Sequence, residues 1–178
     1  LSADPANTSL VLVTTCLAAA AGGLGAALFS GFLYKNLDLT MFMNGVLGGL
    51  VGITAGADQM GPTEAIIIGA IGGVIVVLGV ALLDKCKLDD PVGAIPVHLF
   101  AGIWGTLAVG IFGASAGFDQ FMVQLASVGI VGAFCVICTI IIALGVKAIM
   151  GLRVSDEEET QGLDIAEHGT GAYADFSM

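Results

Sequence analysis

The chain has 178 residues, of which 57% are hydrophobic and only 11% are charged, and its mean hydropathy is +1.00. Soluble domains carry about twice that share of charge, so the composition excludes an ordinary soluble domain. Five Lys and Arg stand against fifteen Asp and Glu, a balance that excludes a typical nucleic-acid-binding protein. Because a membrane-spanning helix takes about 20 residues, the length allows an all-α polytopic membrane protein of about five or six spans.

Polar and turn residues divide the chain into five apolar segments and a polar end. We predict transmembrane helices over residues 8–33, 39–57, 64–83, 91–112 and 120–150, and an acidic tail over residues 151–178. Asp38 is placed to cap the second helix, where a carboxylate accepts hydrogen bonds from free N–H groups. Asp90 followed by Pro91 predicts a capped start for the fourth helix, with proline at the first helical position. The organisation is thus a membrane region, residues 1–150, followed by the tail.

All the basic residues fall on one side of this predicted topology. They follow or end the first, third and fifth helices: Lys35, Lys85, Lys87, Lys147 and Arg153. The positive-inside rule counts Lys and Arg near the helix ends and places them in the cytoplasm. We therefore expect the N-terminal end outside the cell and the tail in the cytoplasm.

His98 is the one histidine inside a predicted span. Ionisable residues at membrane depth are costly and are usually functional. A neutral imidazole has one donor and one acceptor nitrogen, which suits a pore that passes a small molecule. The alternative is a neutral imidazole that only hydrogen-bonds a neighbouring helix. No serine or acid lies at the same depth to form a catalytic set, so the sequence does not predict an enzyme.

Other polar or helix-breaking residues in the spans also carry expectations. Asn44 is predicted to hydrogen-bond across helices, as polar residues in membranes often do. Thr54 either lines an outer vestibule or donates its hydroxyl to the carbonyl four residues back. Pro96 removes the N–H that would bond the Val92 carbonyl within a helix, so we expect a kink or a local opening near His98.

The 27 glycines indicate helices that pack closely. Gly45 with Gly49 and Gly69 with Gly73 have the four-residue spacing that lets membrane helices approach each other. Trp104 is predicted to be a packing residue.

Cys135 and Cys138 form a CxxC motif inside the fifth predicted helix. A zinc site would need further Cys or His ligands beside this pair, and the sequence places none there. We therefore predict no metal, no cofactor and no disulfide framework.

Four segments together resemble the ammonium transporter family, whose members include the methylammonium permeases. The segments are TTCLAAAAG at 14–22, NGVLGGLVGITAG at 44–56, DDPVGAIPVHLFAGIWGTLAVGIF at 89–112 and GLRVSDEEETQGLDIAEHGTGAY at 151–173. In order, they are similar to the seventh, eighth and tenth helices and the cytoplasmic tail of the family. The chain is therefore identified as resembling the seventh to eleventh helices of this eleven-helix fold.

The resemblance implies a homotrimer in the plasma membrane, or inner membrane, that conducts ammonium or ammonia through a narrow pore in each protomer. His98 corresponds to the second of two pore histidines and Thr54 to a position near the external mouth, and Asn44 completes the expected pore residues. The tail resembles a regulatory segment that packs under the neighbouring protomer, on the face where a PII-type signalling protein closes bacterial members. Its expected regulatory residues are Arg153, Gly162, Asp164, His168 and Tyr173.

The sequence departs from the family pattern at several positions. Leu99 follows the histidine where the family has glycine, and it either narrows the pore or repacks a neighbour. Thr14 stands where the seventh-helix motif has asparagine, and Ala166 stands where plant members have a regulatory threonine. The first inverted repeat and its pore histidine have no counterpart here, so we expect a C-terminal portion of a longer transporter.

Two alternatives to a conducting channel or transporter remain open. One is an ammonium sensor of the same fold with little flux, which Leu99 would favour. The other is a non-transporting membrane subunit that assembles with a separate N-terminal half.

Overall fold

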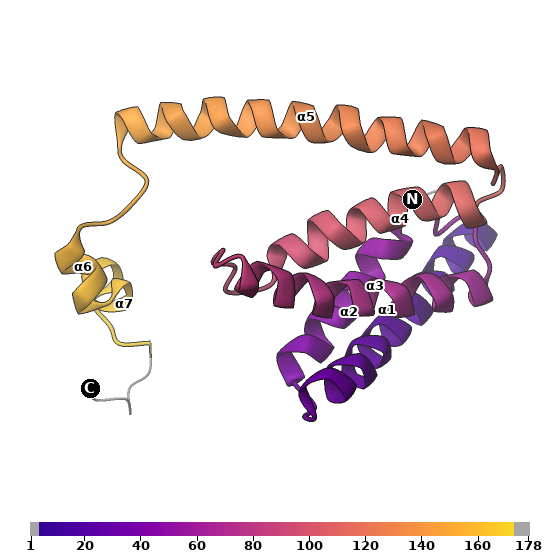
Figure 1. Ribbon diagram of the computed structural model, residues 1–178, viewed down its shortest axis with the longest axis horizontal. Coiled ribbons are helices and arrows are strands. Elements are labelled where there is room, and N and C mark those ends of the chain that lie inside the picture. Colours follow the sequence, from indigo (N-terminus) through magenta and orange to yellow (C-terminus); the bar gives the residue numbers. More distant parts are fainter. Residues whose placement is uncertain (1–3, 173–178) are drawn as a thin grey trace. The chain divides into compact units, whose positions relative to one another are not determined.

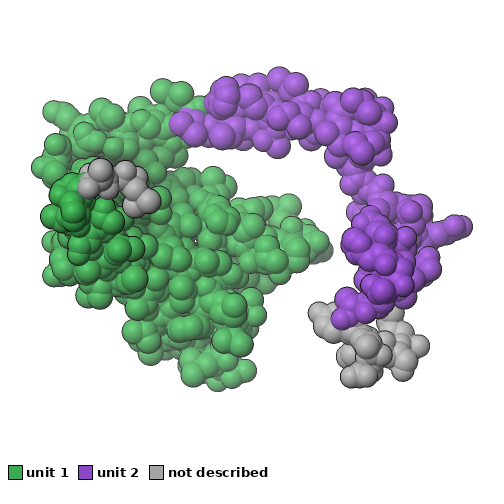
Figure 2. All heavy atoms as spheres, turned by 180° about the vertical axis from the view of Figure 1, so that it is seen from behind, with its two compact units in different colours: residues 1–130 green, residues 131–178 purple. Residues whose placement is uncertain are grey.

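The computed structural model describes residues 4–172, and every regular element within that range is a helix (Figure 1). The elements in chain order are α1 (Pro5–Tyr34), α2 (Leu39–Thr54), α3 (Pro62–Lys85), the π-helix η1 (Ile95–Phe100), α4 (Ala101–Phe112), α5 (Phe118–Ile149), α6 (Asp156–Gln161) and α7 (Leu163–His168). The predicted all-α class is therefore confirmed. The chain divides into two compact units, residues 1–130 and residues 131–178 (Figure 2), and α5 contributes to both.

Within residues 4–172, four helical segments are long and apolar enough to cross a membrane. They are α1, α3, the continuous segment of η1 and α4, and α5. The remaining predicted span corresponds to α2, which has 16 residues and ends at Thr54 because residues 55–59 form turns. At about 1.5 Å per residue this helix rises about 24 Å, somewhat less than the ~30 Å hydrocarbon core of a bilayer.

Local sequence signals explain where these helices begin and end. Asp38 caps α2 as predicted, since its Oδ1 accepts a hydrogen bond from the Met41 N–H at 3.0 Å. Asp4 caps α1 in the same way, and α3 begins with Pro62 at its first position, where a missing N–H does no harm. Lys35 ends α1 in the left-handed conformation, with φ of 59°.

The middle of α1 packs closely against the backbones of α2 and α3, with the small side chain of Ala26 also against Gly45. A Cβ built on Gly45 of α2 would lie 2.7 Å from the carbonyl oxygen of Gly22 in α1. A Cβ on Gly49 would overlap the carbonyl oxygen of Ala18, one turn earlier in α1. On α3, a Cβ on Gly73 would overlap the Gly22 carbonyl as well. Two helices therefore approach the Gly22 backbone at once, which residues without a Cβ permit.

The glycine pairs predicted from their spacing are thus confirmed as sites of close helix packing. Gly69 completes the second pair, because a Cβ on it would lie 2.6 Å from the Ala18 Cα. The fourth span packs closely against α2 as well. A Cβ on Gly105 of α4 would overlap the carbonyl oxygen of Gly52 in α2.

A small apolar core lies beside these glycine contacts in unit 1, residues 1–130. Its buried members are Ala18, Ile53, Ala57, Met60, Ala65, Ile68, Ala108 and Val109, and Val11, Leu17, Trp104 and Phe112 pack against them. The packing role predicted for Trp104 is confirmed. The indole Nε1 also donates a hydrogen bond to the Ile68 carbonyl at 3.1 Å, which links α4 to α3.

Thr14 supplies a further polar link that the sequence analysis did not find. Its side chain is fully buried, and its hydroxyl donates to the Ala57 carbonyl at 2.9 Å. This bond ties α1 to the turn that follows α2. A buried hydroxyl in a membrane helix needs such a partner, because hydrocarbon offers none.

The glycine contacts predict a position-dependent effect of adding one methyl group. We expect Gly49→Ala to lower the unfolding midpoint, because the methyl meets backbone that cannot move aside, and overpacking of this kind costs about 1–3 kcal/mol. The measurement is thermal unfolding in detergent, followed by circular dichroism.

Gly52→Ala in the same helix is the matched control. A Cβ there has its nearest neighbours at 3.5 Å, an ordinary contact. Alanine also has an intrinsic helix advantage of up to about 1 kcal/mol over glycine. Equal midpoints for the two variants would contradict the backbone contact at Gly49.

Candidate functional site

His98 lies in η1, the π-helical segment that opens the fourth span. The wider turn is closed by the Ala101 N–H, which donates to the Pro96 carbonyl five residues back. Segments of π-helix are rare and occur frequently at functional sites. The wider backbone turn at His98 is therefore a π-helix, and it does not arise from an unpaired Val92 carbonyl inside the helix, as the sequence predicted.

The N–H groups at the start of this helix are all satisfied. Asp90 Oδ1 accepts from the Ala94 N–H at 2.9 Å, and its Oδ2 accepts from the Ile95 N–H at 2.8 Å. Pro96 has no N–H, and the Val97 N–H donates to the carbonyl four residues back at 3.2 Å. One carboxylate therefore holds the first turn of the helix that carries His98.

The start of this helix differs from the sequence prediction. Residues 91 and 92 form a turn rather than a first helical turn that begins at Pro91. Gly93 then adopts φ of 72°, a left-handed conformation that favours glycine, and helical structure follows it. Pro96 is thus in the first turn, and the Val92 carbonyl lies outside the helix.

Asn44 is the partner of that carbonyl. Its side chain is 8% exposed, and its Nδ2 donates to the Val92 oxygen at 3.1 Å. The cross-helix hydrogen bond predicted for Asn44 is confirmed, with the loop backbone before η1 as acceptor. A Cβ on Gly93 would lie 2.6 Å from the same Nδ2, so the amide requires glycine at that position.

The imidazole of His98 is on the open side of η1. Pro96 and Val97 are buried, whereas His98 is exposed and Leu99 is 52% exposed. Within residues 4–172, no hydrogen bond joins the His98 side chain to another group, and both the pore role and the structural alternative stay predictions. Leu99 projects into the same open side rather than packing into the core.

Thr54 has the local hydrogen bond that the sequence analysis offered as one of two alternatives. Its hydroxyl donates to the Leu50 carbonyl, four residues back, at 2.7 Å. The residue is exposed at the end of α2, and its role at a vestibule stays a prediction. No hydrogen bond in the described part of the chain joins Thr54 to Asn44 or His98, so the three expected pore residues do not form one polar cluster.

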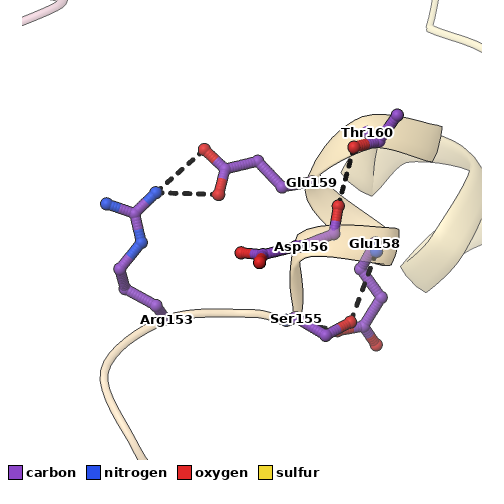
Figure 3. Close-up of polar contacts among 6 residues, drawn as sticks. All are labelled: Arg153, Ser155, Asp156, Glu158, Glu159 and Thr160. Carbon is purple, nitrogen blue, oxygen red and sulfur yellow. Dashed lines mark hydrogen bonds and ion pairs between the residues drawn. The ribbon is translucent and has the colours of Figure 1, made fainter.

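The acidic tail, for which no secondary structure was predicted, contains the two short helices α6 and α7. Before α6, Ser155 and Glu158 form a reciprocal capping box (Figure 3). The Ser155 N–H donates to Glu158 Oε2 at 2.9 Å, and the Glu158 N–H donates to the Ser155 Oγ at 3.3 Å. Arg153 reaches the same helix, where its Nη2 lies 2.8 Å from both carboxylate oxygens of Glu159.

The other expected tail residues lie around α7. Gly162 separates α6 from α7 with φ of 95°. Asp164 accepts from the Ala172 N–H at 2.8 Å and so folds the chain back onto α7. His168 is the last residue of α7. Tyr173 lies outside the described residues.

Two tail carboxylates, those of Glu158 and Asp164, have lowered pKa values. The backbone N–H of Ser155, followed by its hydroxyl, lowers the pKa of Glu158. The backbone N–H of Ala172 is the main cause that lowers the pKa of Asp164, with smaller contributions from the Ile165 N–H and the charge of His168. Hydrogen bonds donated to a carboxylate favour its ionised form, so both acids are held charged.

The sequence itself contains a signal for the start of α6, the spacing of Ser155 and Glu158. Serine followed three residues later by glutamate is the usual mark of a capping box, and Ser155 and Glu158 have that spacing. The π-helix has no comparable signature in a single sequence. Across residues 4–172, no group of three or more His, Cys, Asp and Glu lies close enough together to hold a metal ion.

Comparison with known proteins identifies similar chains. The sequence model of the Ammonium Transporter Family matches residues 1–173. Over 193 residues the chain is 38% identical to the ammonium transporter Amt2 of Archaeoglobus fulgidus, covering 99% of this chain and 41% of that protein. Over 176 residues it is 39% identical to Amt2 of Methanocaldococcus jannaschii, covering 96% of this chain and 41% of that one.

A solved structure agrees with these matches. The structure titled "Sensor Amt Protein" superposes with a TM-score of 0.86 at 32% identity, covering 94% of this chain and 43% of the other. The chain therefore spans about two fifths of the length of the proteins that it matches, at 41% and 43%.

The capping box predicts a measurable change in the acidity of Glu158. Its lowered pKa in the folded tail contributes stability to α6 at neutral pH, and that stability is lost as the pH falls through the folded pKa. Ser155→Ala removes the hydroxyl partner, so we expect the pKa of Glu158 to rise towards its ordinary value. Carboxyl chemical shifts measured by NMR over a pH titration test this.

Thr160→Ala is the control for that titration. The Thr160 hydroxyl donates only to the Asp156 carbonyl within α6, at 2.7 Å, and does not contact Glu158. The backbone N–H of Ser155 remains in Ser155→Ala, so only part of the shift should be lost; a pKa of Glu158 identical to that of the parent would show that the Ser155 hydroxyl does not contribute to it.

Proposed function

The chain belongs to the Ammonium Transporter Family, and from this premise we propose that it forms part of an integral membrane transporter that conducts ammonium or ammonia. The family match over residues 1–173 carries the proposal. Identities of 38% and 39% to two proteins named as ammonium transporters support it, and those names are of transporters rather than enzymes. The chain covers 41% of each, so the proposed pore includes helices beyond this sequence.

In this proposal His98 lines the pore. Its imidazole is exposed on the open side of η1, and it makes no hydrogen bond within residues 4–172. A neutral imidazole can accept from or donate to a small molecule that has lost its water. A fixed charge at the same depth would be costly in a dry pore. Leu99 beside it presents an apolar wall that narrows the path.

The assembly and orientation belong to the proposal as well. The one-sided placement of Lys and Arg supports a cytoplasmic tail in the plasma or inner membrane. The homotrimer, with the tail helices α6 and α7 as the face for a PII-type regulatory protein, is what the family resemblance implies.

The experiment that tests conduction uses the complete transporter that contains this segment, purified and reconstituted in liposomes. An inward ammonium gradient should produce a current or an internal pH change that scales with protein content. Ammonium binding without any flux would replace the proposal with a sensor. Flux that requires co-purification of a second chain carrying the other helices would identify a two-subunit transporter.

His98→Leu tests the pore role directly. Leucine keeps a similar volume but removes both nitrogen atoms, so the conducted molecule loses its hydrogen-bond partner. We expect the initial ammonium flux to fall by about tenfold, the factor that corresponds to one hydrogen bond of ~1.4 kcal/mol. Stopped-flow fluorescence of a pH dye inside the liposomes measures the flux.

Ser127→Ala serves as the control for His98→Leu. The Ser127 hydroxyl donates only to the Val123 carbonyl in α5, at 2.9 Å, so this variant should conduct as the parent does. Unchanged flux in His98→Leu would rule out His98 as a pore residue.

Gly162→Asp tests whether the tail acts on the pores. Gly162 has φ of 95° and ψ of 131°, and a Cβ there would lie 2.7 Å from Asp164 Oδ1. An aspartate at position 162 would strain the backbone by about 1 kcal/mol or more. Its carboxylate would also be repelled by the like charge of Asp164. We expect α6 and α7 to separate and the flux of the assembled trimer to fall.

Gly169→Asp is the matched control for the tail. Gly169 is also left-handed, with φ of 66°, but a Cβ there would meet nothing within 4 Å, and aspartate tolerates this conformation better than most residues. The same charge is therefore added without the clash. Equal flux in Gly162→Asp and the parent would argue against coupling between tail and pore.

A further inference from the structure

We propose that Asn44 is a positioning residue for His98, because its buried amide holds the Val92 carbonyl at the point from which the histidine-bearing helix starts. The inference rests on the proposed role of His98 in conduction. It assigns Asn44 a different role from the pore-lining one that the sequence suggested. The juxtaposition of the Asn44 amide, the Val92 carbonyl and Gly93 carries it.

The Asn44 amide is buried and hydrogen-bonded to the loop before η1. Asn44 is 8% exposed, and its Nδ2 is engaged with the Val92 oxygen at 3.1 Å. A Cβ on Gly93 would lie 2.6 Å from that Nδ2 and 3.4 Å from the Asn44 Cγ, so the loop backbone is packed directly on the amide. The bond to Val92 uses one of the two amide N–H donors and fixes the amide against the loop backbone.

The chain connects this contact to His98 through Gly93 and the first turn of η1. Gly93 turns the chain immediately after Val92, and the Asp90 carboxylate then holds the N–H groups of Ala94 and Ile95. His98 comes one turn later. Each link is fixed by a backbone hydrogen bond or by a left-handed glycine. A shift of the Val92 carbonyl is therefore passed to the start of η1.

The Asn44 bond adds a directional contact from α2 to the start of η1, beside the Asp90 carboxylate that holds its first turn. On its buried side η1 rests on α3, where a Cβ on Gly79 would lie 2.8 Å from the Pro96 Cβ and 2.7 Å from the Phe100 Cδ2. Apolar contacts of this kind are not directional. Within residues 4–172, the one side-chain hydrogen bond from another membrane helix to residues 91–100 is that of Asn44.

The test compares two variants that each delete one hydrogen bond of the same kind. Asn44→Leu removes the side-chain N–H that donates to the Val92 carbonyl at 3.1 Å. Trp104→Phe removes the indole N–H that donates to the Ile68 carbonyl, also at 3.1 Å. Trp104 lies in the same span as His98, but after it in the sequence. Both are made in the complete transporter. The readouts are the unfolding midpoint, the rate at which diethyl pyrocarbonate modifies His98, followed by mass spectrometry of its peptide, and the maximal ammonium flux.

We expect both variants to lower the unfolding midpoint to a similar extent. Only Asn44→Leu should change the modification rate of His98, and it should lower the maximal flux by about tenfold, as displacement of a positioned group does. Altered His98 reactivity in both variants, or in neither, would overturn the proposal. If Asn44→Leu alone alters the modification rate of His98 but the parent transporter shows no ammonium flux, Asn44 still positions His98, and the proposal that the protein conducts ammonium is wrong.

Gly93→Ala provides a second route to the same displacement if Asn44→Leu does not fold. The added methyl pushes the amide off the Val92 carbonyl while Asn44 is still present. In an Asn44→Ala background there is no amide to push, so Gly93→Ala should alter His98 reactivity less than it does in the parent. Effects that are additive in this double-mutant cycle would contradict the inference.

Discussion

The close approach of three helix backbones at Gly22 is the contact on which the rest of unit 1 depends. Gly45 of α2 and Gly73 of α3 both meet the Gly22 carbonyl of α1, and Gly49 of α2 meets the Ala18 carbonyl one turn earlier. In a membrane, apolar side chains gain little by leaving lipid, so helices associate mainly through close van der Waals packing and interhelical hydrogen bonds. The separation that these glycines set decides which polar groups can reach across from helix to helix.

The buried polar side chains use that short separation to satisfy backbone carbonyls. Thr14 donates to Ala57, Asn44 to Val92 and Trp104 to Ile68. Among the described residues, no buried side-chain nitrogen or oxygen lacks a partner, as hydrocarbon surroundings demand. His98 is different, because its imidazole is exposed and without a hydrogen bond in the same range.

The tail is stabilised by different physics. Its helices α6 and α7 are short and exposed, so they depend on the capping box of Ser155 and Glu158, the ion pair of Arg153 with Glu159 and the turn that Asp164 closes. Such contacts weaken with salt and with acid, whereas the glycine contacts of the membrane helices do not. Under the proposed function, this allows conditions in the cytoplasm to reorganise the tail while the pore helices keep their fold.

The sequence by itself determined the all-α membrane class, the approximate helix limits, the Asp38 cap and the glycine pairs, because each depends on hydropathy, spacing or turn chemistry within a few residues. It also singled out His98 and Asn44 from their cost in hydrocarbon. Only the tertiary structure decided the π-helix, the start of the fourth span after Gly93 rather than at Pro91, and the engagement of Asn44 with Val92. Those features depend on contacts between residues such as Asn44 and Val92, which are 48 positions apart, and a local pattern contains no information about such distances.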